Sequence, residues 1–514
     1  MRGGCAPARS TRLSPPPDEP VPRRRAGCPG VRPDGPEQPA PALQTPSRGA
    51  DAPPAPRPAA DRGAGRGDPV RTRTAERPTI DGELLARLLF YSAGVTRTAG
   101  DNLWFRAAPS AGNLHPLEMY VVAGEVAGLD AGLYHFAPEV FGLEALAAGD
   151  HRRALANATA DPDVAAGPLA LVVTGLPWRT AWKYAERGWR HVYWDAGTML
   201  ANLLAVAEGH GLPARVRLGF VDAAVSRLLG VDGVTEFPVA VITCGRPAAI
   251  AAAEPVELPP PPFPPTPLSP APVDFPLVNR VQQAGELTTG DDVTGWRAAA
   301  VAGLPRATDT VDAPVGAGSE PIESVILRRG STRRMRRQLA PAELLHWAMA
   351  AATRAVPADA IPTGTTLLSH EVAVHAVHGT EPGLYQQVDG PPQLRRPAPD
   401  AKVRTLSQGL CLDQPLGGDS AYTDFACADL DQVLGGYGER GYRVAQFEAG
   451  VAAGRLQLAA FTLGHGGTGL TFCDQDVSDA FDTRAACMLA IAIGLPAYRP
   501  KPGGPPGRPR RITR

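Results

Sequence analysis

The sequence predicts an α+β fold class, a layer with few strands and a long buried helix, and it predicts this unit twice. Short apolar runs of strand length follow longer runs with helical spacing, and the same order of segments recurs later in the chain. With 514 residues, the chain is also too long for one ordinary hydrophobic core. We therefore expect two similar domains.

Proline and glycine mark the boundaries of these domains. Each occurs 56 times, and they gather in three stretches. Residues 1–70 are rich in Pro and Arg and have almost no aliphatic clusters, so we expect a disordered leader. A Pro-rich run at 255–276 predicts a stiff, partly extended spacer within a linker at 249–321. The predicted domains are residues 78–248 and 322–500, and residues 501–514 are expected to form a tail.

Each predicted domain opens with a helix. Its apolar face has i, i+1, i+4, i+5 spacing, with Leu84, Leu85, Leu88 and Leu89 in the first domain and Leu344, Leu345, Ala348 and Met349 in the second. In the first domain, strands are predicted at 118–122, 170–174 and 238–244. A long helix is predicted at 195–209, where Gly209 and Gly211 end it.

An internal repeat relates the two domains. KYAERGWR at 183–190 and GYGERGYR at 436–443 match or differ by close swaps at six of eight positions, which sets an offset of 437 − 184 = 253 residues. The same offset places Asp195-Ala196-Gly197 on Glu448-Ala449-Gly450 and residues 109–118 on 362–371 without a gap, while Gly132-Leu133-Tyr134 and Gly383-Leu384-Tyr385 fall two residues off. The sequence therefore predicts a tandem duplication.

Composition argues against nucleic-acid or lipid partners and against membrane insertion or secretion. A net charge of −1 gives no bulk attraction to nucleic acid or to anionic lipid. No apolar window is long enough for a membrane span, and the leader lacks the apolar run of a secretion signal. We therefore expect a soluble protein. Seven cysteines form an odd set without a C-x-x-C pair or zinc spacing, so we expect no metal site and a reducing cytoplasm.

Several motifs of the first domain occur together in one order. RAAPSAGNLHPLEMYVV at 106–122 is followed by GLYHF at 132–136, by WKYAERGWRH at 182–191 and by the helix that begins at Asp195. In order and spacing this set resembles the SagB-type peptide dehydrogenases of the nitroreductase superfamily. The resemblance implies a nitroreductase-like fold, in which a central, mostly antiparallel sheet is flanked by helices. It also implies an FMN cofactor and the oxidation of azolines to azoles in ribosomally made peptides. Because subunits of that superfamily dimerise with flavin between them, it also implies that the two copies form a pseudo-dimer within one chain.

The PSAGN segment is the first candidate for the cofactor site. Gly112 would let the backbone approach a planar ligand, while Ser110 and Asn113 offer a hydroxyl and an amide suited to the polar edge of a flavin ring. The alternative is a plain Pro-Ser-Gly turn between a helix and a strand.

Lys183 and Tyr184 match a Lys-Tyr pair that the azoline dehydrogenases use for catalysis. Oxidation of an azoline removes a proton and a hydride, and a lysine acts as the base only if its pKa is lowered. The surrounding tryptophans could provide the required desolvation: Trp178, Trp182, Trp189 and Trp194. Tyr184 could donate or relay a proton. The alternative is a surface lysine beside a core tyrosine.

Three further residues have weaker motifs. Asn202 lies where the family helix carries an amide, and Gly219 lies where family members bring the backbone near the flavin, but helix packing and a plain turn are equal alternatives. His115 could reach a substrate or could be a hydrogen-bonded structural residue.

The second copy has lost part of this set and has gained another. Gly436, Thr366 and Arg455 replace Lys183, Asn113 and Asn202, so the second copy should not run the same chemistry alone. Its opening LRRGSTRRMRR, at 327–337, resembles a superfamily motif in which arginines and a hydroxyl bind the FMN phosphate. We therefore expect one composite site, to which the second copy contributes Arg328, Arg329, Ser331 and Arg333. The alternative is a solvated basic run.

The leading functional hypothesis is an FMN-dependent dehydrogenase acting on a peptide. The sequence has no ATP site of a cyclodehydratase, so a separate cyclodehydratase partner would make the azoline. Two alternatives remain: an NAD(P)H-dependent, nitroreductase-like reductase of small aromatics, and a flavin-free scaffold in a peptide-modifying complex.

Overall fold

The computed structural model describes residues 80–100, 103–246, 269, 273–299, 301–309, 313–314, 317 and 320–512. The predicted leader at 1–70 and most of the Pro-rich run at 255–276 lie outside these residues. Two large sheets and a small three-stranded sheet, with their helices, make up the described structure, so the predicted α+β class is confirmed. We call residues 80–246 the first half and residues 320–512 the second half.

The sheet of the first half has six strands in the order β5-β4-β3-β6-β8-β7, and all neighbours are antiparallel. The strands are β3 (Leu117–Ala123), β4 (Gly132–Ala137), β5 (Gly142–Ala148), β6 (Leu169–Gly175), β7 (Ala214–Arg217) and β8 (Phe237–Cys244). The helices are α1 (Gly82–Ala93), α2 (Arg152–Thr159), α3 (Asp163–Ala166), α4 (Trp178–Tyr184), α5 (Gly188–Gly209) and α6 (Asp222–Leu229). The three strands and two helices predicted for this half are confirmed.

The sheet of the second half repeats this order as β12-β11-β10-β13-β15-β14, and β9 (Met335–Arg336) pairs with the end of β15. Its other strands are β10 (Leu368–Val374), β11 (Gly383–Gln387), β12 (Gln393–Pro397), β13 (Tyr422–Ala428), β14 (Gly466–Leu470) and β15 (Ala486–Pro496). The helices are α9 (Ile322–Arg328), α10 (Glu343–Ala352), α11 (Asp400–Leu410), α12 (Pro415–Asp419), α13 (Leu430–Tyr437), α14 (Arg440–Thr462) and α15 (Asp474–Phe481).

The match between residues 109–118 and 362–371 is not free of gaps. Glu118 pairs with Thr174 across β3 and β6, and a constant offset of 253 would pair Glu371 with Cys427. Glu371 instead pairs with Phe425. The β10 strand is therefore shifted by two residues from the position that an offset of 253 predicts. The sequence predicted the same two-residue shift for Gly383-Leu384-Tyr385 of β11.

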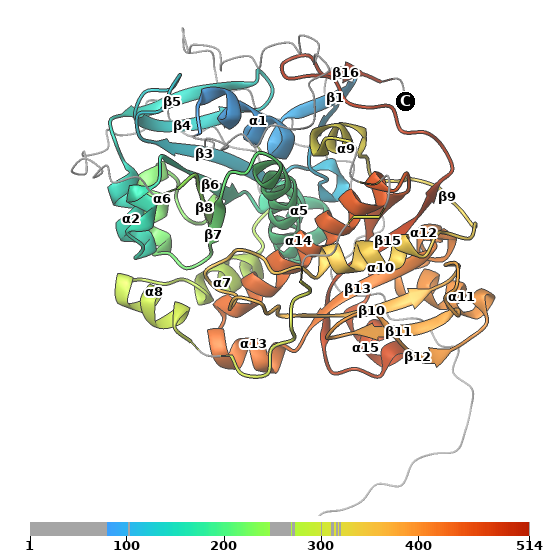
Figure 1. The fold of residues 1–514 in the computed structure, drawn as a ribbon. Coiled ribbons are helices and arrows are strands. Elements are labelled where there is room, and N and C mark those ends of the chain that lie inside the picture. The colour runs from blue at the N-terminus through green and yellow to red at the C-terminus, as the bar shows by residue number, and fades with distance from the viewer. Residues whose placement is uncertain are drawn as a thin grey trace, which may run out of the picture.

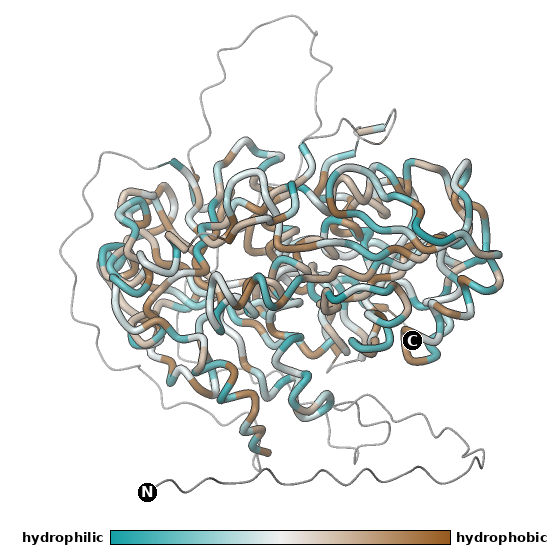
Figure 2. Tube along the Cα trace, turned by 90° about the horizontal axis from the view of Figure 1, so that it is seen from below, coloured by the Kyte–Doolittle hydropathy of each residue, from teal (hydrophilic) through white to brown (hydrophobic). Residues whose placement is uncertain are grey.

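The long helices α5 and α14 cross at the centre of the molecule, with one sheet on either side (Figure 1). Glycines make this crossing close: a Cβ added to Gly450 would lie 2.5 Å from the Trp194 carbonyl oxygen and 3.0 Å from Gly197 Cα. Apolar stretches run through the interior, while the outer loops are mostly hydrophilic (Figure 2). One apolar core thus continues across both halves.

Two regions differ from the predicted domain plan. The linker at 249–321 contains α7 (Pro276–Ala284) and α8 (Gly290–Arg297), the second opened by a capping box between Thr289 and Asp292. The tail at 501–514 returns to the first half, where β16 (Arg510–Arg511) pairs in parallel with β1 (Val95–Ala99), itself paired with β2 (Leu103–Arg106). Within the described ranges, no helix combines the length and apolar character that a membrane span requires.

Candidate functional site

Two adjoining cavities lie between the halves, and both halves line each of them. The first has a volume of about 270 Å³ and the second about 350 Å³. Pro109 and Ser110 of the first half and Ser331 and Arg333 of the second half line both cavities. Predicted candidates from both halves, Ser110 of the first and Ser331 and Arg333 of the second, are therefore brought together in one place.

Gly112, Lys183 and Tyr184 lie next to one another in the wall of the first cavity. Its φ of 62° is left-handed, and a Cβ there would lie 2.8 Å from the Tyr184 hydroxyl and 3.2 Å from Lys183 Nζ. Both side chains project from the end of α4. A side chain at position 112 would therefore strain the backbone and would press against the Tyr184 hydroxyl and Lys183 Nζ.

Arg179 fixes α4 relative to the loop that carries Gly112. Arg179 stands in the first turn of α4, where its Nη1 donates to the His115 carbonyl oxygen at 3.1 Å and lies 2.5 Å from Glu118 Oε1. Arg179 and His115 are buried, so the ion pair and hydrogen bond are shielded from water. This contact sets the distance between the loop and the Lys183-Tyr184 pair.

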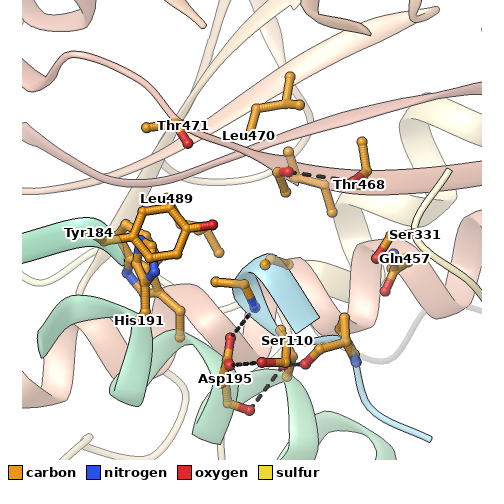
Figure 3. Close-up of a pocket in the computed structure, with 18 of the residues that line it drawn as sticks. Ser110, Tyr184, His191, Asp195, Ser331, Gln457, Thr468, Leu470, Thr471 and Leu489 are labelled. Atoms are coloured by element: carbon orange, nitrogen blue, oxygen red, sulfur yellow. Dashed lines mark hydrogen bonds between the residues drawn. The ribbon is translucent and has the colours of Figure 1, made fainter. Parts of the chain in front are cut away.

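The loop is also held by Asp195 of α5. Ser110 Oγ donates to Asp195 Oδ2 at 2.5 Å, and the Ala111 amide donates to Oδ1 at 3.1 Å. Figure 3 shows this contact below the cavity, opposite Thr468, Leu470 and Thr471. The Ser110 hydroxyl thus donates its hydrogen bond to the Asp195 carboxylate. This differs from the prediction that Ser110 contacts the polar edge of a flavin ring directly.

Asn113 is used within the loop as well. Its amide Nδ2 donates to the Trp104 carbonyl oxygen at 2.7 Å, and its Oδ1 lies 3.1 Å from His115 Nε2. Asn113 lines the second cavity and not the first. Its contacts, like those of buried His115, hold the backbone shape of the loop.

The protonation states around Tyr184 follow from burial. Burial, with the nearby Asp195, raises the pKa of Tyr184 to about 12. Burial and then Arg187 lower the pKa of His191, whose ring centre lies 4.2 Å from that of Tyr184, to about 3. Burial also raises the pKa of Asp195 to about 7. At neutral pH, Tyr184 therefore keeps its proton and His191 is neutral.

The tryptophans do not enclose Lys183 as expected. Lys183 is exposed, and Trp194 is the only one of the four predicted tryptophans among the residues that line the first cavity. Trp189 instead stacks on Tyr442 with ring centres 5.4 Å apart. Any desolvation of Lys183 must therefore come from a ligand that covers it.

The second cavity is lined by cationic groups. They are Arg97, Arg106, Arg329, Arg333, Arg499 and Lys501. Arg106 is buried, and its Nε and Nη2 have no hydrogen-bond partner among the described residues. Burial and then Arg97 lower the pKa of Arg329 to about 9, while Arg329 also donates to the Ala107 carbonyl oxygen. Such unpaired and crowded cations favour an anion between them.

Three predicted residues lie away from the cavities. Arg328 pairs with Glu320 and donates to the Phe461 carbonyl oxygen, so it is turned from the second cavity. Asn202 donates to the Tyr91 carbonyl oxygen at 3.0 Å and ties α5 to α1. Gly219 packs against the ring of Trp296. None of the three is among the lining residues.

Sequence reasoning missed the wall formed by β14 and the residue after it, Thr468 to Thr471. A signal for this wall was present. With the repeat offset, the equivalent of Leu218 is residue 218 + 253 = 471. If the two copies pair as the subunits of a dimer do, the second copy contributes this segment to the site, as it contributes the arginines. Asp195 was likewise missed, although the repeat aligned it with another carboxylate, Glu448.

Comparison with known proteins gives the family of the first half. The nitroreductase family model matches residues 75–246. MJ1384 of Methanocaldococcus jannaschii, named as a nitroreductase, is 30% identical over 164 residues, which are 32% of this chain and 79% of that protein.

Two peptide-processing proteins are also similar. The trifolitoxin-processing protein TfxB of Rhizobium leguminosarum bv. trifolii is 32% identical over 161 residues, which are 29% of this chain and 43% of TfxB. The microcin B17-processing protein McbC of Escherichia coli is 28% identical over 142 residues, which are 26% of this chain and 52% of McbC. The chain thus spans about half of these two relatives or less.

A crystal structure of an Anabaena variabilis protein assigned to the nitroreductases resembles the larger part of the molecule. The TM-score is 0.64 at 26% identity, over 81% of this chain and 88% of that one. The likeness therefore extends well beyond residues 75–246, and the nitroreductase-like fold is confirmed. Taken together with the match over most of MJ1384, it shows that the chain is a member of the nitroreductase family.

Proposed function

We propose that this oxidoreductase is an FMN-dependent dehydrogenase that converts azolines to azoles in a ribosomally made peptide. The observation that carries the proposal is the position of Lys183 and Tyr184, which lie beside Gly112 in the wall of a cavity that the second half also lines. The two named relatives that process peptides, TfxB and McbC, support a peptide substrate.

The residues around the cavities fit FMN. The backbone at Gly112 allows a flat ring to approach closely, and the second cavity offers Arg106, Arg329 and Arg333 to a dianionic phosphate. In this proposal Ser331 joins the phosphate set, while Ser110 and Asn113 hold the loop rather than the ring. Bound FMN would supply the acceptor for the hydride.

Lys183 and Tyr184 would handle the protons. Lys183 is exposed and lines the first cavity, so a peptide ring that covers it would remove its Nζ from water. It would then take the proton from the azoline carbon as the hydride leaves the ring. Tyr184 keeps its proton at neutral pH because its pKa is raised to about 12, so it would act as a hydrogen-bond donor to the azoline.

We infer further that the two halves are tandem copies and that one composite FMN site serves the chain. The identical strand order of the two sheets and the close glycine contact between α5 and α14 support a pseudo-dimer. A separate cyclodehydratase would supply the azoline, and the azole peptide would leave as the product.

The direct test is turnover of an azoline-containing peptide by the flavin-loaded protein. Each ring should lose two hydrogens, measured as a mass change of the peptide, with oxygen as the final acceptor. Flavin-loaded protein that leaves such peptides unchanged, and that NAD(P)H bleaches rapidly, would instead support reduction of small aromatics. The name of MJ1384 favours that second function. A purified protein without flavin would support the scaffold hypothesis.

A further inference from the structure

Residues of the first cavity have equivalents in the second half. Tyr437 ends α13 and Glu448 lies in α14, and each follows its equivalent, Tyr184 or Asp195, by 253 residues. Glu448 accepts hydrogen bonds from Thr366 Oγ1 at 2.7 Å and from the Leu367 amide at 2.9 Å. The same contact between a carboxylate and a loop is thus built twice. We call the space beside Tyr437 the counterpart site.

Trp296 of α8 fills the counterpart site. Its ring lies 2.9 Å from the position of a Cβ on Gly219, and its centre lies 5.5 Å from that of Tyr437. Its Nε1 donates to the Tyr437 carbonyl oxygen at 2.9 Å. Trp296 is buried, and the guanidinium of Arg440 lies 5.6 Å from its ring centre. A planar aromatic side chain therefore takes the place beside this tyrosine.

The edge of β7 is covered at the same site. The Val216 amide donates to the Pro357 carbonyl oxygen at 2.8 Å, and the Asp359 amide donates to the Val216 carbonyl oxygen at 3.1 Å. The Asp359 carboxylate also accepts the Leu218 amide at 2.7 Å and Arg297 Nε at 3.0 Å. The equivalent of Leu218 is Thr471, which lines the open first cavity.

Val301 fills the remaining position of the catalytic pair. Gly436 stands where the first half has Lys183, and a Cβ on Gly436 would clash with Val301 Cγ2. The adjacent Gly435 has nothing within 4 Å of its Cβ position. The loss of the lysine and the presence of Val301 are therefore physically linked.

We propose that Trp296 and Val301 are built-in occupants of the counterpart site, and that this site, once emptied, binds a planar heteroaromatic ring. The segment between the halves would then leave the chain with one open ring site out of two. This inference rests on the proposed function in one respect, that the ring bound in the first cavity is the flavin ring of FMN.

The first experiment empties the counterpart site and offers it lumiflavin, a flavin ring without a phosphate. The Trp296→Ala, Val301→Ala variant should melt at a lower temperature than wild type, because it loses a buried aromatic side chain. Saturating lumiflavin, added to FMN-treated protein, should raise its Tm by about 5 °C more than that of wild type. Trp189→Ala is the control, since it removes another buried tryptophan elsewhere and should show no such difference.

An equal response of the double variant and wild type would overturn the proposal. The FMN content of each protein, measured in parallel, separates this failure from a failure of the proposed function, which would show as absent FMN in wild type.

A second experiment does not depend on the folding of that variant. Gly436→Ala should lower the Tm by a few degrees in wild type, but should leave it unchanged or raise it when Val301 is also Ala, since alanine is the better helix former. Gly435→Ala should be neutral or stabilising in both backgrounds. If Gly436→Ala behaved like Gly435→Ala in wild type, Val301 would not occupy the position of the missing lysine side chain.

Discussion

At the scale of single residues, Lys183 and Tyr184 are the groups to which the chemistry is assigned. Neither holds another part of the chain through a hydrogen bond or ion pair among the described residues, so their removal should change turnover and not binding of the cofactor. We expect Lys183→Ala and Tyr184→Phe to keep FMN and to lose about 10² to 10⁴ in azoline oxidation. The measurement is the rate of azole formation beside flavin absorbance. Unaltered turnover by Lys183→Ala would remove it as the base.

Two separable features favour a glycine at position 112, its left-handed backbone and its closeness to the Tyr184 hydroxyl. We expect Gly112→Ala to lose both FMN and activity, because the methyl group would displace the Tyr184 hydroxyl and Lys183 Nζ in the cavity wall. Gly364→Ala is the matched control, since Gly364 also has positive φ (76°) but nothing within 4 Å of its Cβ position. That control should cost only the backbone strain, on the order of 1 kcal/mol. Equal FMN content in both variants would contradict the assigned close approach.

Asp195 should make stability depend on pH. Its folded pKa of about 7 lies above the value of an exposed aspartate, so its contribution is present at acidic pH and is lost as the pH rises toward 7. Relative to Asp195→Asn, the free energy of unfolding of wild type should fall by roughly 1.4 kcal/mol per unit between pH 5 and 7, and then level off. Denaturant unfolding of both proteins at several pH values measures this. A constant difference over that range would show that Asp195 titrates normally.

The roles of the loop residues were only partly predictable. The PSAGN motif correctly marked where the loop lies, but it could not show that Ser110 and Asn113 direct their polar atoms to Asp195 and Trp104. Those partners are 85 and 9 residues away, respectively, and their positions depend on how α5 and β2 pack. The exposure of Lys183 was unpredictable for the same reason, because the nearby tryptophans turn to other partners.

At the scale of elements, the crossing of α5 and α14 joins the halves through small residues. We expect Gly450→Ala to destabilise the protein by roughly 1–3 kcal/mol, because its methyl group would meet Trp194 of the facing helix. Gly409→Ala in α11 is the control, with nothing within 4 Å, and should be neutral or stabilising by up to about 1 kcal/mol. Denaturant unfolding compares the two. Similar effects of both changes would mean that the helices cross less closely.

The elements that were predicted are those with strong local patterns. The apolar runs of β3, β6 and β8 and the periodic faces of α1 and α10 can be recognised without knowledge of their neighbours. By contrast, β16 has two arginines in a Pro- and Gly-rich segment and exists only because β1 offers it an edge. The helices α7 and α8 are short, although the TTGDD segment at the start of α8 contains a capping signal.

At the scale of the whole molecule, the two sets of residues that the sequence separates by more than 100 positions meet between the halves. Ser331 and Arg333 line the same cavities as Ser110, and the first cavity also includes Lys183 and Tyr184. The repeat and the motifs predicted this arrangement. Each copy lacks a motif that the other copy has, so a complete site requires that the two copies pair. The filling of the counterpart site was not predictable, since Trp296 lies in a segment that the repeat does not cover.

The central claim is that one FMN is held jointly by both halves, and its content per chain tests this most directly. Wild type should carry about one FMN per polypeptide. Arg333→Ala should lose most of it, because Arg333 lines both cavities, while Arg334→Ala should keep it, because its exposed neighbour Arg334 lines neither. Two FMN per chain, or full FMN content in Arg333→Ala, would contradict the composite site.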